Sequence, residues 1–509
     1  MKEQKAAGVI LSYLGQIVHI ISGLLFTPIM LDMLGDSEYG LYNLVFSTVS
    51  YMSLLSLGFS SSYMRFYSRY NAQKDEKGIA RLNGMFLSIF IVISIVCLLC
   101  GAILVTGIEV VFADGLTASE YSLARKLMAL MTFNLALTFP NSVFDSITSS
   151  KECFFFQKIL IVAQNVLNPF ITIPLLLMGY GSIYVVMVTT ILSIAKLIVN
   201  GWFCIKRLKA KFDFKKFDFS LLKEMSAFTF FIFIGQIVDQ INWHIDSVLL
   251  GRFMGTAATA VYGVGAQINS LYIQLSTAVS NVFIPQVNRI VAESNDDSKL
   301  SKVFTKVGRI QFAVLFLVLS GFIFFGKQFI VLWTDESKEL AYYVVLLLII
   351  PVTVPLIQNI GIEIQRAKNM HKSRSLVYLG IAVLNIFISI PSIKYFGIPG
   401  AAFGTAFALI AGNVVFINWY YYKIMKLDVI YFWKNIFSFI PSLILPLITG
   451  FILVHIINVN SWLKLIICIA VYTVVYLVSL IAFGLNSEEK QMLSKFTRKF
   501  KKHEVVKHE

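Results

Sequence analysis

Long apolar runs alternate with short polar gaps along almost the whole chain. A transmembrane helix needs about 20 mostly apolar residues. Fourteen segments meet this length: 9–33, 40–66, 83–111, 124–148, 155–179, 181–204, 225–250, 256–285, 306–332, 339–365, 375–394, 399–422, 431–456 and 461–484. Because lipid offers no hydrogen-bond partner to the backbone, each segment is predicted to be a helix. The pattern predicts an all-α integral membrane protein of about 14 transmembrane helices.

Composition supports this reading. Of the 509 residues, 57% are hydrophobic and only 14% are charged, whereas a soluble domain carries about 25% charged residues. The net charge of +15 comes from residues in the short gaps, as expected for cytoplasmic loops, so no nucleic-acid partner is expected. The five cysteines show neither a disulfide framework nor a zinc pattern, and no cofactor is expected.

The distribution of basic residues predicts the orientation of the chain. If the N-terminus is cytoplasmic and the loops alternate, 35 of the 43 lysines and arginines lie on the inner side and seven on the outer side. Cytoplasmic loops are enriched in lysine and arginine in this way. Both termini are therefore predicted to be cytoplasmic.

An internal repeat divides the chain. Gly15–Val18 recurs as Gly235–Val238 at an offset of 220 residues, and Val166–Pro174 recurs in similar form as Val383–Pro391 at an offset of 217. Six spans in each copy predict two six-helix bundles related by a pseudo-two-fold axis along the membrane normal. In transporters built this way the substrate site lies between the repeats, and rocking them alternates its access.

The repeat and the span count predict five segments. They are an N-terminal bundle (1–206), a cytoplasmic linker (207–224), a C-terminal bundle (225–425), two extra transmembrane helices (426–485) and a basic cytoplasmic tail (486–509).

Two loop motifs resemble those of a known family. Residues 34–42 read LGDSEYGLY and residues 396–405 read FGIPGAAFGT. With the layout of six, six and two helices, the whole chain resembles the oligosaccharide (Wzx-type) flippases of the MATE-like MOP exporter superfamily. The resemblance implies a MATE-like fold in the bacterial cytoplasmic membrane. It also implies that an undecaprenyl-diphosphate-linked oligosaccharide crosses from the cytoplasmic to the outer leaflet by alternating access. The implied partners are that lipid-linked oligosaccharide, membrane lipids, a polysaccharide polymerase and glycosyltransferases.

The seventh predicted span carries the densest set of ionisable residues, namely Asp239, His244 and Asp246. At 100° per residue, Asp239 and Asp246 lie about 20° apart on one face of the helix. Ionisable groups inside a membrane are costly and usually functional, so the two carboxylates are candidates for binding Na⁺ or carrying a proton. A polar face satisfied by neighbouring helices is the alternative, and Asp246 is near enough to the outer surface to be simply hydrated.

The resemblance also implies a sodium site formed by the seventh, eleventh and twelfth spans. Its candidate ligands here are Asp239, Asn385 and Thr405, whose oxygen atoms suit a hard cation. A structural hydrogen-bonding role for Asn385 is the alternative. No other metal site is expected.

Basic residues are the candidates for binding the diphosphate and sugar, because a phosphate group needs cations inside the cavity. The candidates are Arg65, Arg69, Lys196, Arg252, Arg289 and Arg309. For the arginines at cytoplasmic span ends, ordinary topology signalling is the alternative. Lys196 lies inside the sixth span. The alternative to substrate binding is that its long side chain extends along the helix and places the ammonium group at the membrane interface.

Residues 321–327 have phosphate-loop spacing, but Gln328 stands where the motif needs Ser or Thr. Without ATP machinery, the driving force is an ion gradient or the substrate gradient. One alternative function is a MATE-type drug/cation antiporter, which differs in its cargo. Another is a membrane-embedded glycan polymerase, which usually needs long outer loops that this chain lacks.

Overall fold

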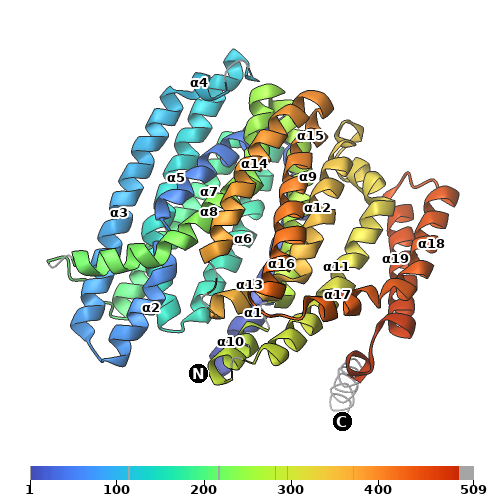
Figure 1. The fold of residues 1–509 in the computed structure, drawn as a ribbon. Coiled ribbons are helices and arrows are strands. Elements are labelled where there is room, and N and C mark those ends of the chain that lie inside the picture. The colour runs from blue at the N-terminus through green and yellow to red at the C-terminus, as the bar shows by residue number, and fades with distance from the viewer. Residues whose placement is uncertain are drawn as a thin grey trace, which may run out of the picture. The chain divides into compact units, whose positions relative to one another are not determined.

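The computed structural model describes residues 2–112, 115–215, 218–280, 283–294, 296–368, 370 and 372–491. Over these ranges the chain is helical and no strand occurs (Figure 1). The predicted all-α class is therefore confirmed. Most of the predicted basic tail, residues 492–509, lies outside the described residues.

The helices follow the predicted apolar runs in chain order. Those up to residue 253 are α1 (Lys2–Ser50), η1 (Tyr51–Ser56), α2 (Phe59–Ala72), α3 (Glu76–Thr106), α4 (Ile108–Phe112), α5 (Ala118–Ser150), α6 (Phe154–Leu177), α7 (Ser182–Trp202), η3 (Phe203–Arg207) and α8 (Phe219–Phe253). Those that follow are α9 (Thr256–Ser280), α10 (Ile284–Glu293), α11 (Asp297–Trp333), η4 (Glu336–Lys338), α12 (Ala341–Ile357), α13 (Asn359–Ala367), α14 (Lys372–Phe396), α15 (Ile398–Leu409), η5 (Ile410–Phe416), α16 (Ile417–Lys423), α17 (Val429–Phe437), α18 (Ile440–Ile456), α19 (Trp462–Ser479) and η6 (Leu480–Gly484).

Short polar side chains in the gaps start several of these helices. An N-cap side chain accepts a hydrogen bond from one of the first backbone N–H groups, which have no partner inside the helix. The capping residues are Asp75 for α3, Thr117 for α5, Asp218 for α8, Asp296 for α11 and Asp428 for α17. The polar gaps between apolar runs therefore also define where the helices begin.

Backbone breaks occur where glycine permits them. Gly35 has φ 71° and ψ 171°, which interrupts α1 in the predicted loop between the first two spans. Gly179, at φ 83°, lies in the turn between α6 and α7 and confirms the division predicted there. The predicted second span, residues 40–66, is not one helix, because Leu57 and Gly58 adopt left-handed conformations between η1 and α2.

In the described part of the chain, nine helices are long and apolar enough to cross a membrane. Two further pairs, α12 with α13 and α17 with α18, bend by 45° and 42° and raise the number to at most 11 if each pair is one span. Neither α8 nor α9 is among the nine. The multi-pass arrangement is clear, and the exact number of 14 spans stays a prediction.

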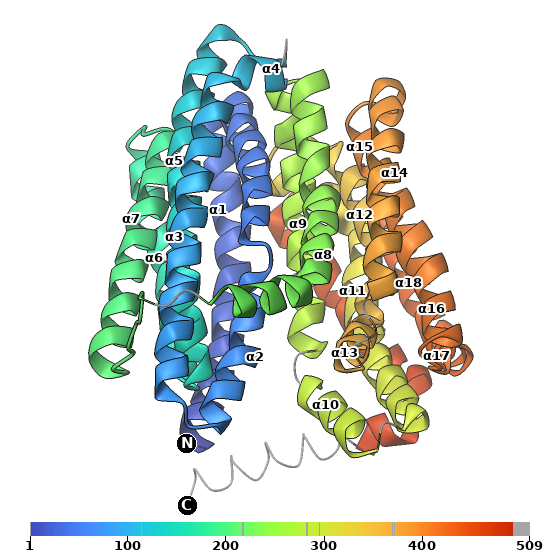
Figure 2. The ribbon, with the colours of Figure 1, turned by 60° about the vertical axis from the view of Figure 1, so that its left-hand side comes forward.

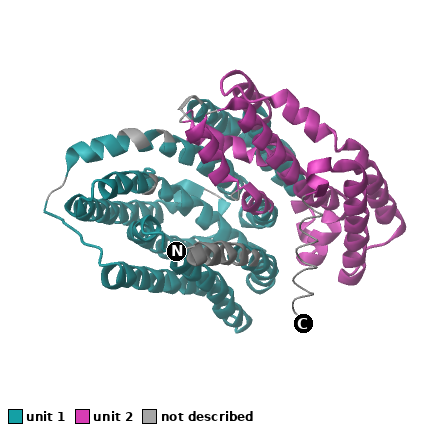
Figure 3. Cartoon of the chain, turned by 90° about the horizontal axis from the view of Figure 1, so that it is seen from below, with its two compact units in different colours: residues 1–271, 343–348, 371–412 teal, residues 272–342, 349–370, 413–509 magenta. Residues whose placement is uncertain are grey.

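The structure divides into two compact units (Figure 3). Unit 1 comprises residues 1–271, 343–348 and 371–412. Within it α3 and α7 lie along α5, as Figure 2 shows, and α6 lies along α1. Its interior holds a large apolar cluster in which Phe86, Phe90 and Leu127 are almost fully buried. Lipid is as apolar as these side chains, so the hydrophobic effect does not drive the helices together inside a membrane. Close packing of this kind holds them together instead.

Unit 2 comprises residues 272–342, 349–370 and 413–509, and α11 is its central element, in contact with α13, α17, α18 and α19. Arg309 of α11 is only 3% exposed. Its guanidinium donates to both carboxylate oxygens of Glu489 at 2.7 and 2.8 Å, to the carbonyl oxygens of Asn435 and Gly484, and to the Ser438 hydroxyl. This network ties the C-terminal helices to α11.

The two units are defined by which residues contact one another in this structure. This definition does not test the predicted division into two six-helix bundles, which therefore stays a prediction.

Candidate functional site

A buried carboxylate lies at the centre of a polar cluster in unit 1. Asp246 of α8 is 1% exposed. Its Oδ2 atom accepts hydrogen bonds from the Tyr262 hydroxyl of α9 at 2.6 Å and from the Thr405 hydroxyl of α15 at 2.8 Å. Its Oδ1 atom accepts a longer one, 3.5 Å, from Ser389 of α14. A charge inside a membrane is costly, and donors from three other helices offset that cost.

Asn385 of α14 completes this group. Its amide nitrogen donates to the Thr405 hydroxyl at 3.1 Å, and its amide oxygen accepts from Ser389 at 3.0 Å. Asn385, Ser389 and Thr405 are fully buried. We call Asp246, Tyr262, Asn385, Ser389 and Thr405 the Asp246 cluster. It contains one carboxylate and several neutral oxygen atoms.

Small residues bring α14 and α15 close enough to form the cluster. Gly400 and Gly404 belong to the 396–405 motif. A Cβ atom on Gly400 would lie 2.0 Å from the Ser392 carbonyl oxygen, and one on Gly404 would lie 2.0 Å from the Ser389 hydroxyl. The motif therefore has a packing role beside the site.

Gly400→Ala is expected to destabilise the protein by about 1–3 kcal/mol, because the added methyl group would force α14 and α15 apart. The measurement is the thermal unfolding midpoint in detergent. Gly380→Ala on α14 is the matched control, since no neighbouring atom lies within 4 Å of its added Cβ and alanine favours a helix by about 0.5–1 kcal/mol. If Gly400→Ala raises the midpoint as the control does, the close approach is wrong.

Asn385 and Thr405, which the resemblance places in one sodium site with Asp239, lie together in the structure, and the carboxylate bonded to Thr405 is that of Asp246. Asp239, two turns earlier on α8, is exposed. Asp246 is not hydrated at the surface, because its side chain is buried. His244 is partly buried, with its ring 6.1 Å from that of Phe46 and 6.5 Å from that of Tyr51.

The six predicted basic residues lie in different surroundings. Arg65, Arg69, Arg252 and Arg289 are exposed. Arg69 pairs with Glu224 at 3.1 Å, and Arg252 donates to the Val111 carbonyl oxygen at 3.1 Å. Glu224 lies near the start of α8 and Arg252 near its end, so these two arginines lie at opposite ends of that helix. Buried Arg309 is held by Glu489 within unit 2.

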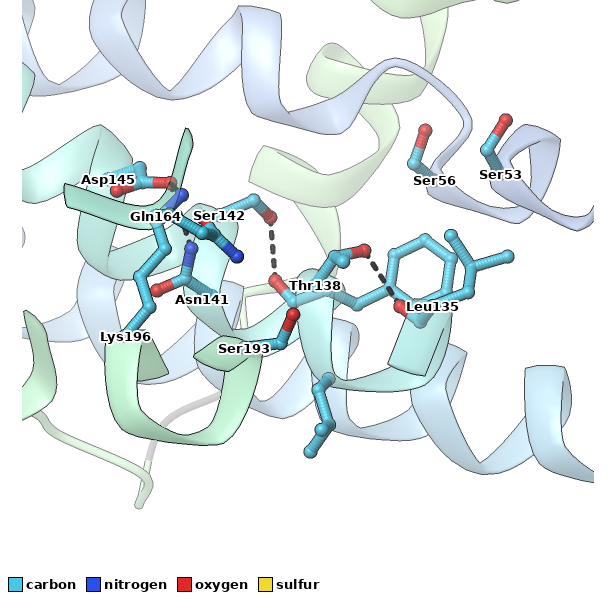
Figure 4. A pocket seen from close by; sticks show the side chains of 12 residues that line it. Ser53, Ser56, Leu135, Thr138, Asn141, Ser142, Asp145, Gln164, Ser193 and Lys196 are labelled. Atoms are coloured by element: carbon cyan, nitrogen blue, oxygen red, sulfur yellow. Dashed lines mark hydrogen bonds and ion pairs between the residues drawn. The ribbon is translucent and has the colours of Figure 1, made fainter. Parts of the chain in front are cut away.

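Lys196 of α7 lies in a pocket of about 370 Å³ in unit 1. We call it the α5–α7 pocket, and its polar side chains include Thr138, Asn141, Asp145, Gln164, Ser193 and Lys196 (Figure 4). The Lys196 ammonium lies 3.8 Å from an Asp145 carboxylate oxygen. Asp145 also accepts hydrogen bonds from Asn141 at 2.9 Å and from Asn200 at 2.7 Å.

Sequence reasoning missed Asp145, Tyr262 and Ser389. A signal was present for Asp145, because it is an aspartate inside a predicted span, where charge is costly. Ser389 falls inside the repeated segment Val383–Pro391, but nothing there marks it as a partner of Asp246, and nothing in the sequence marks Tyr262.

Comparisons with known proteins agree with this architecture. The structure is similar to that of the lipid II flippase MurJ in its inward closed conformation, with a TM-score of 0.71 at 17% identity, over 94% of this chain and 98% of that one. It is also similar to an inward-facing multidrug resistance MATE family transporter of the MOP superfamily, with a TM-score of 0.66 at 15% identity, over 81% of this chain and 95% of that one. At such identities the likeness shows the fold alone.

Two curated proteins are similar in sequence. The uncharacterized membrane protein EpsK of Bacillus subtilis strain 168 is 20% identical over 490 residues, which is 93% of this chain and 94% of EpsK. The probable flippase AglR of Haloferax volcanii is 20% identical over 179 residues, which is 35% of this chain and only 37% of AglR.

The fold defines the class: a multi-pass membrane protein with the fold of the MATE-like MOP superfamily. A family model described as polysaccharide biosynthesis protein matches residues 6–291, more than half of the chain. The chain belongs to this family. The relatives whose names state a role are flippases or transporters, in line with the transporter expected from the sequence.

Proposed function

We propose that this chain is a flippase that moves an undecaprenyl-diphosphate-linked oligosaccharide from the cytoplasmic to the outer leaflet of a bacterial cytoplasmic membrane. The observation that carries the proposal is the match of residues 6–291 to the polysaccharide biosynthesis family in a chain with the MOP transporter fold. The bias of basic residues toward one side supports cytoplasmic termini. Movement by alternating access agrees with the internal repeat.

We further propose that the Asp246 cluster couples transport to a sodium or proton gradient. A single carboxylate surrounded by neutral oxygen atoms balances one monovalent cation or one proton. Because the cluster has one carboxylate, its charge suits a monovalent ion better than a divalent one. Asp246 then takes the place of Asp239 beside Asn385 and Thr405. Roles for Asp239 and His244 stay predictions.

The exposed arginines are the proposed contacts of the diphosphate. Arg65 and Arg69 of α2, in unit 1, are exposed and carry the fork of donors that suits phosphate. Arg289 of α10, in unit 2, is a separate candidate with the same properties. Arg252 is the corresponding candidate near the other end of α8. Arg309 is a weaker candidate, because its guanidinium already makes five hydrogen bonds within unit 2.

Reconstitution into vesicles tests the proposal directly. The substrate is a prenyl-diphosphate oligosaccharide, whose sugar is exposed to a membrane-impermeant lectin only on the outer leaflet. The protein is expected to increase the lectin-accessible fraction, and to do so faster under a sodium or pH gradient. Transport of a cationic dye without movement of the sugar lipid would instead favour the MATE-type drug antiporter.

A further inference from the structure

We propose that the α5–α7 pocket binds the uncharged, hydroxyl-rich sugar part of the substrate rather than its diphosphate. This inference rests on the proposed function and assigns one part of the lipid-linked molecule to one set of side chains. It gives Lys196 a role in sugar recognition.

The charge of the pocket is the first argument. Lys196 and Asp145 are the charged side chains among its lining residues, and they lie 3.8 Å apart. Together they carry no net charge. A diphosphate carries two or more negative charges and requires an excess of cations. A sugar hydroxyl both donates and accepts hydrogen bonds, so it suits a site that offers an ammonium group beside a carboxylate.

The lining of the pocket is the second argument. Nine of the twelve residues around it are polar, mostly hydroxyl and amide side chains. Its volume, about 370 Å³, lies within the range of about 300–1,000 Å³ typical of small-molecule sites. Polar side chains that face a cavity inside a membrane protein usually mark a substrate pathway. Hydroxyl and amide groups in this number match a polyhydroxylated ligand.

The backbone beside the pocket provides an independent observation. Ser53 and Ser56 line it from η1, where the regular helix is interrupted. The break ends at Leu57, with φ 49°, and Gly58, with φ 71°. Irregular backbone at membrane depth is tolerated where it is buried in protein or lines a polar cavity. The interruption of an otherwise apolar span is therefore explained by the cavity that it borders.

A second cavity of about 210 Å³ adjoins the pocket, since both are lined by Leu135 and Thr138. The Asn134 amide oxygen belongs to a residue that lines this second cavity. It is buried, and no donor in the described part of the chain bonds to it. An unsatisfied buried acceptor costs free energy unless a ligand or water reaches it. The two cavities in series offer room for more than one sugar residue.

Two probes separate sugar binding from phosphate binding. One is a short-chain prenyl diphosphate that carries one N-acetylhexosamine, and the other is the same prenyl diphosphate without sugar. Binding to the purified full-length protein is measured by calorimetry. Lys196→Gln and Gln164→Ala are each expected to weaken binding of the sugar-bearing probe by about tenfold or more, and to leave binding of the sugar-free probe unchanged.

Ser146→Ala is the matched control. Ser146 lies on α5 beside the pocket, and its hydroxyl donates to the Ser142 carbonyl of its own helix. This variant is expected to bind both probes as the wild type does. Gln164→Ala keeps the Lys196–Asp145 pair intact, so it tests the proposal even if Lys196→Gln fails to fold.

If the two pocket variants bind both probes more weakly by the same factor, the pocket is a phosphate site and the inference is overturned. If Lys196→Gln and Gln164→Ala both bind the sugar-bearing probe as tightly as the wild type does, the inference is also overturned. If the wild type itself binds the two probes equally, the proposed recognition of a sugar-bearing lipid fails, and the inference fails with it. A wild type that prefers the sugar-bearing probe keeps the proposed function whatever the pocket variants do.

Discussion

Replacing Asp246 by asparagine is expected to abolish gradient-driven transport while the protein still folds and inserts. Asparagine has nearly the same size and retains an oxygen that can accept the hydrogen bonds from Tyr262 and Thr405. It lacks the negative charge that would balance a bound cation. Two unit charges about 4 Å apart attract by about 4 kcal/mol at an effective dielectric constant of about 20, so a loss of about a hundredfold or more in ion-dependent rate is expected.

The measurement is the rate at which the sugar-bearing lipid becomes accessible to lectin on the outer leaflet of proteoliposomes, with and without a sodium or pH gradient. Asp239→Asn is the matched comparison, since Asp239 lies on the same helix but is exposed. We expect it to lose less of the gradient dependence than Asp246→Asn. A wild-type response to the gradient in Asp246→Asn would remove the Asp246 cluster from the coupling mechanism.

Replacing Arg309 by leucine is expected to destabilise the protein by about 3–5 kcal/mol. The change removes the charged partner of the buried Glu489 carboxylate. It also removes the hydrogen bonds that Arg309 donates to the carbonyl groups of Asn435 and Gly484. The packing of the guanidinium over the Phe439 ring, 4.3 Å from its centroid, is also lost. The readout is the thermal unfolding midpoint in detergent.

The double variant Arg309→Leu with Glu489→Leu is the control for this prediction. It removes both charges, so no unpaired buried carboxylate remains, and it is expected to recover much of the lost stability. A single Arg309→Leu variant as stable as the wild type would show that the network does not hold the C-terminal helices in place.

The same pair predicts a pH dependence. Burial alone would raise the pKa of Glu489, but the hydrogen bonds from Arg309 and the Asn486 backbone outweigh it, so the pKa lies below its usual value of 4.5. A carboxylate with a lowered folded-state pKa stabilises the protein fully above its unfolded-state pKa. The difference in stability between wild type and Glu489→Gln should therefore be constant near neutral pH and disappear as the pH falls below 4.5 through the folded-state value.

The local helices follow from the sequence because lipid leaves the backbone no other partner. The polar gaps mark their ends, as Asp75 and Thr117 show by capping α3 and α5, and Gly179 marks a turn between two runs that are otherwise continuous. The break inside the apolar run 40–66 was not predicted. Gly58 is a sequence signal for it, but nothing in the sequence distinguishes Leu57, which also adopts a left-handed conformation.

Helical periodicity alone determined that Asp239 and Asp246 share one face of α8, and the motif of residues 396–405 identified the family resemblance. Only the tertiary structure decided which carboxylate is buried, because burial depends on α9, α14 and α15, which contribute the donors. It also decided that Arg309 meets Glu489, 180 residues later, and that Lys196 meets Asp145. Periodicity orders positions along one helix, whereas the partner of a buried charge is set by other helices that no local pattern identifies.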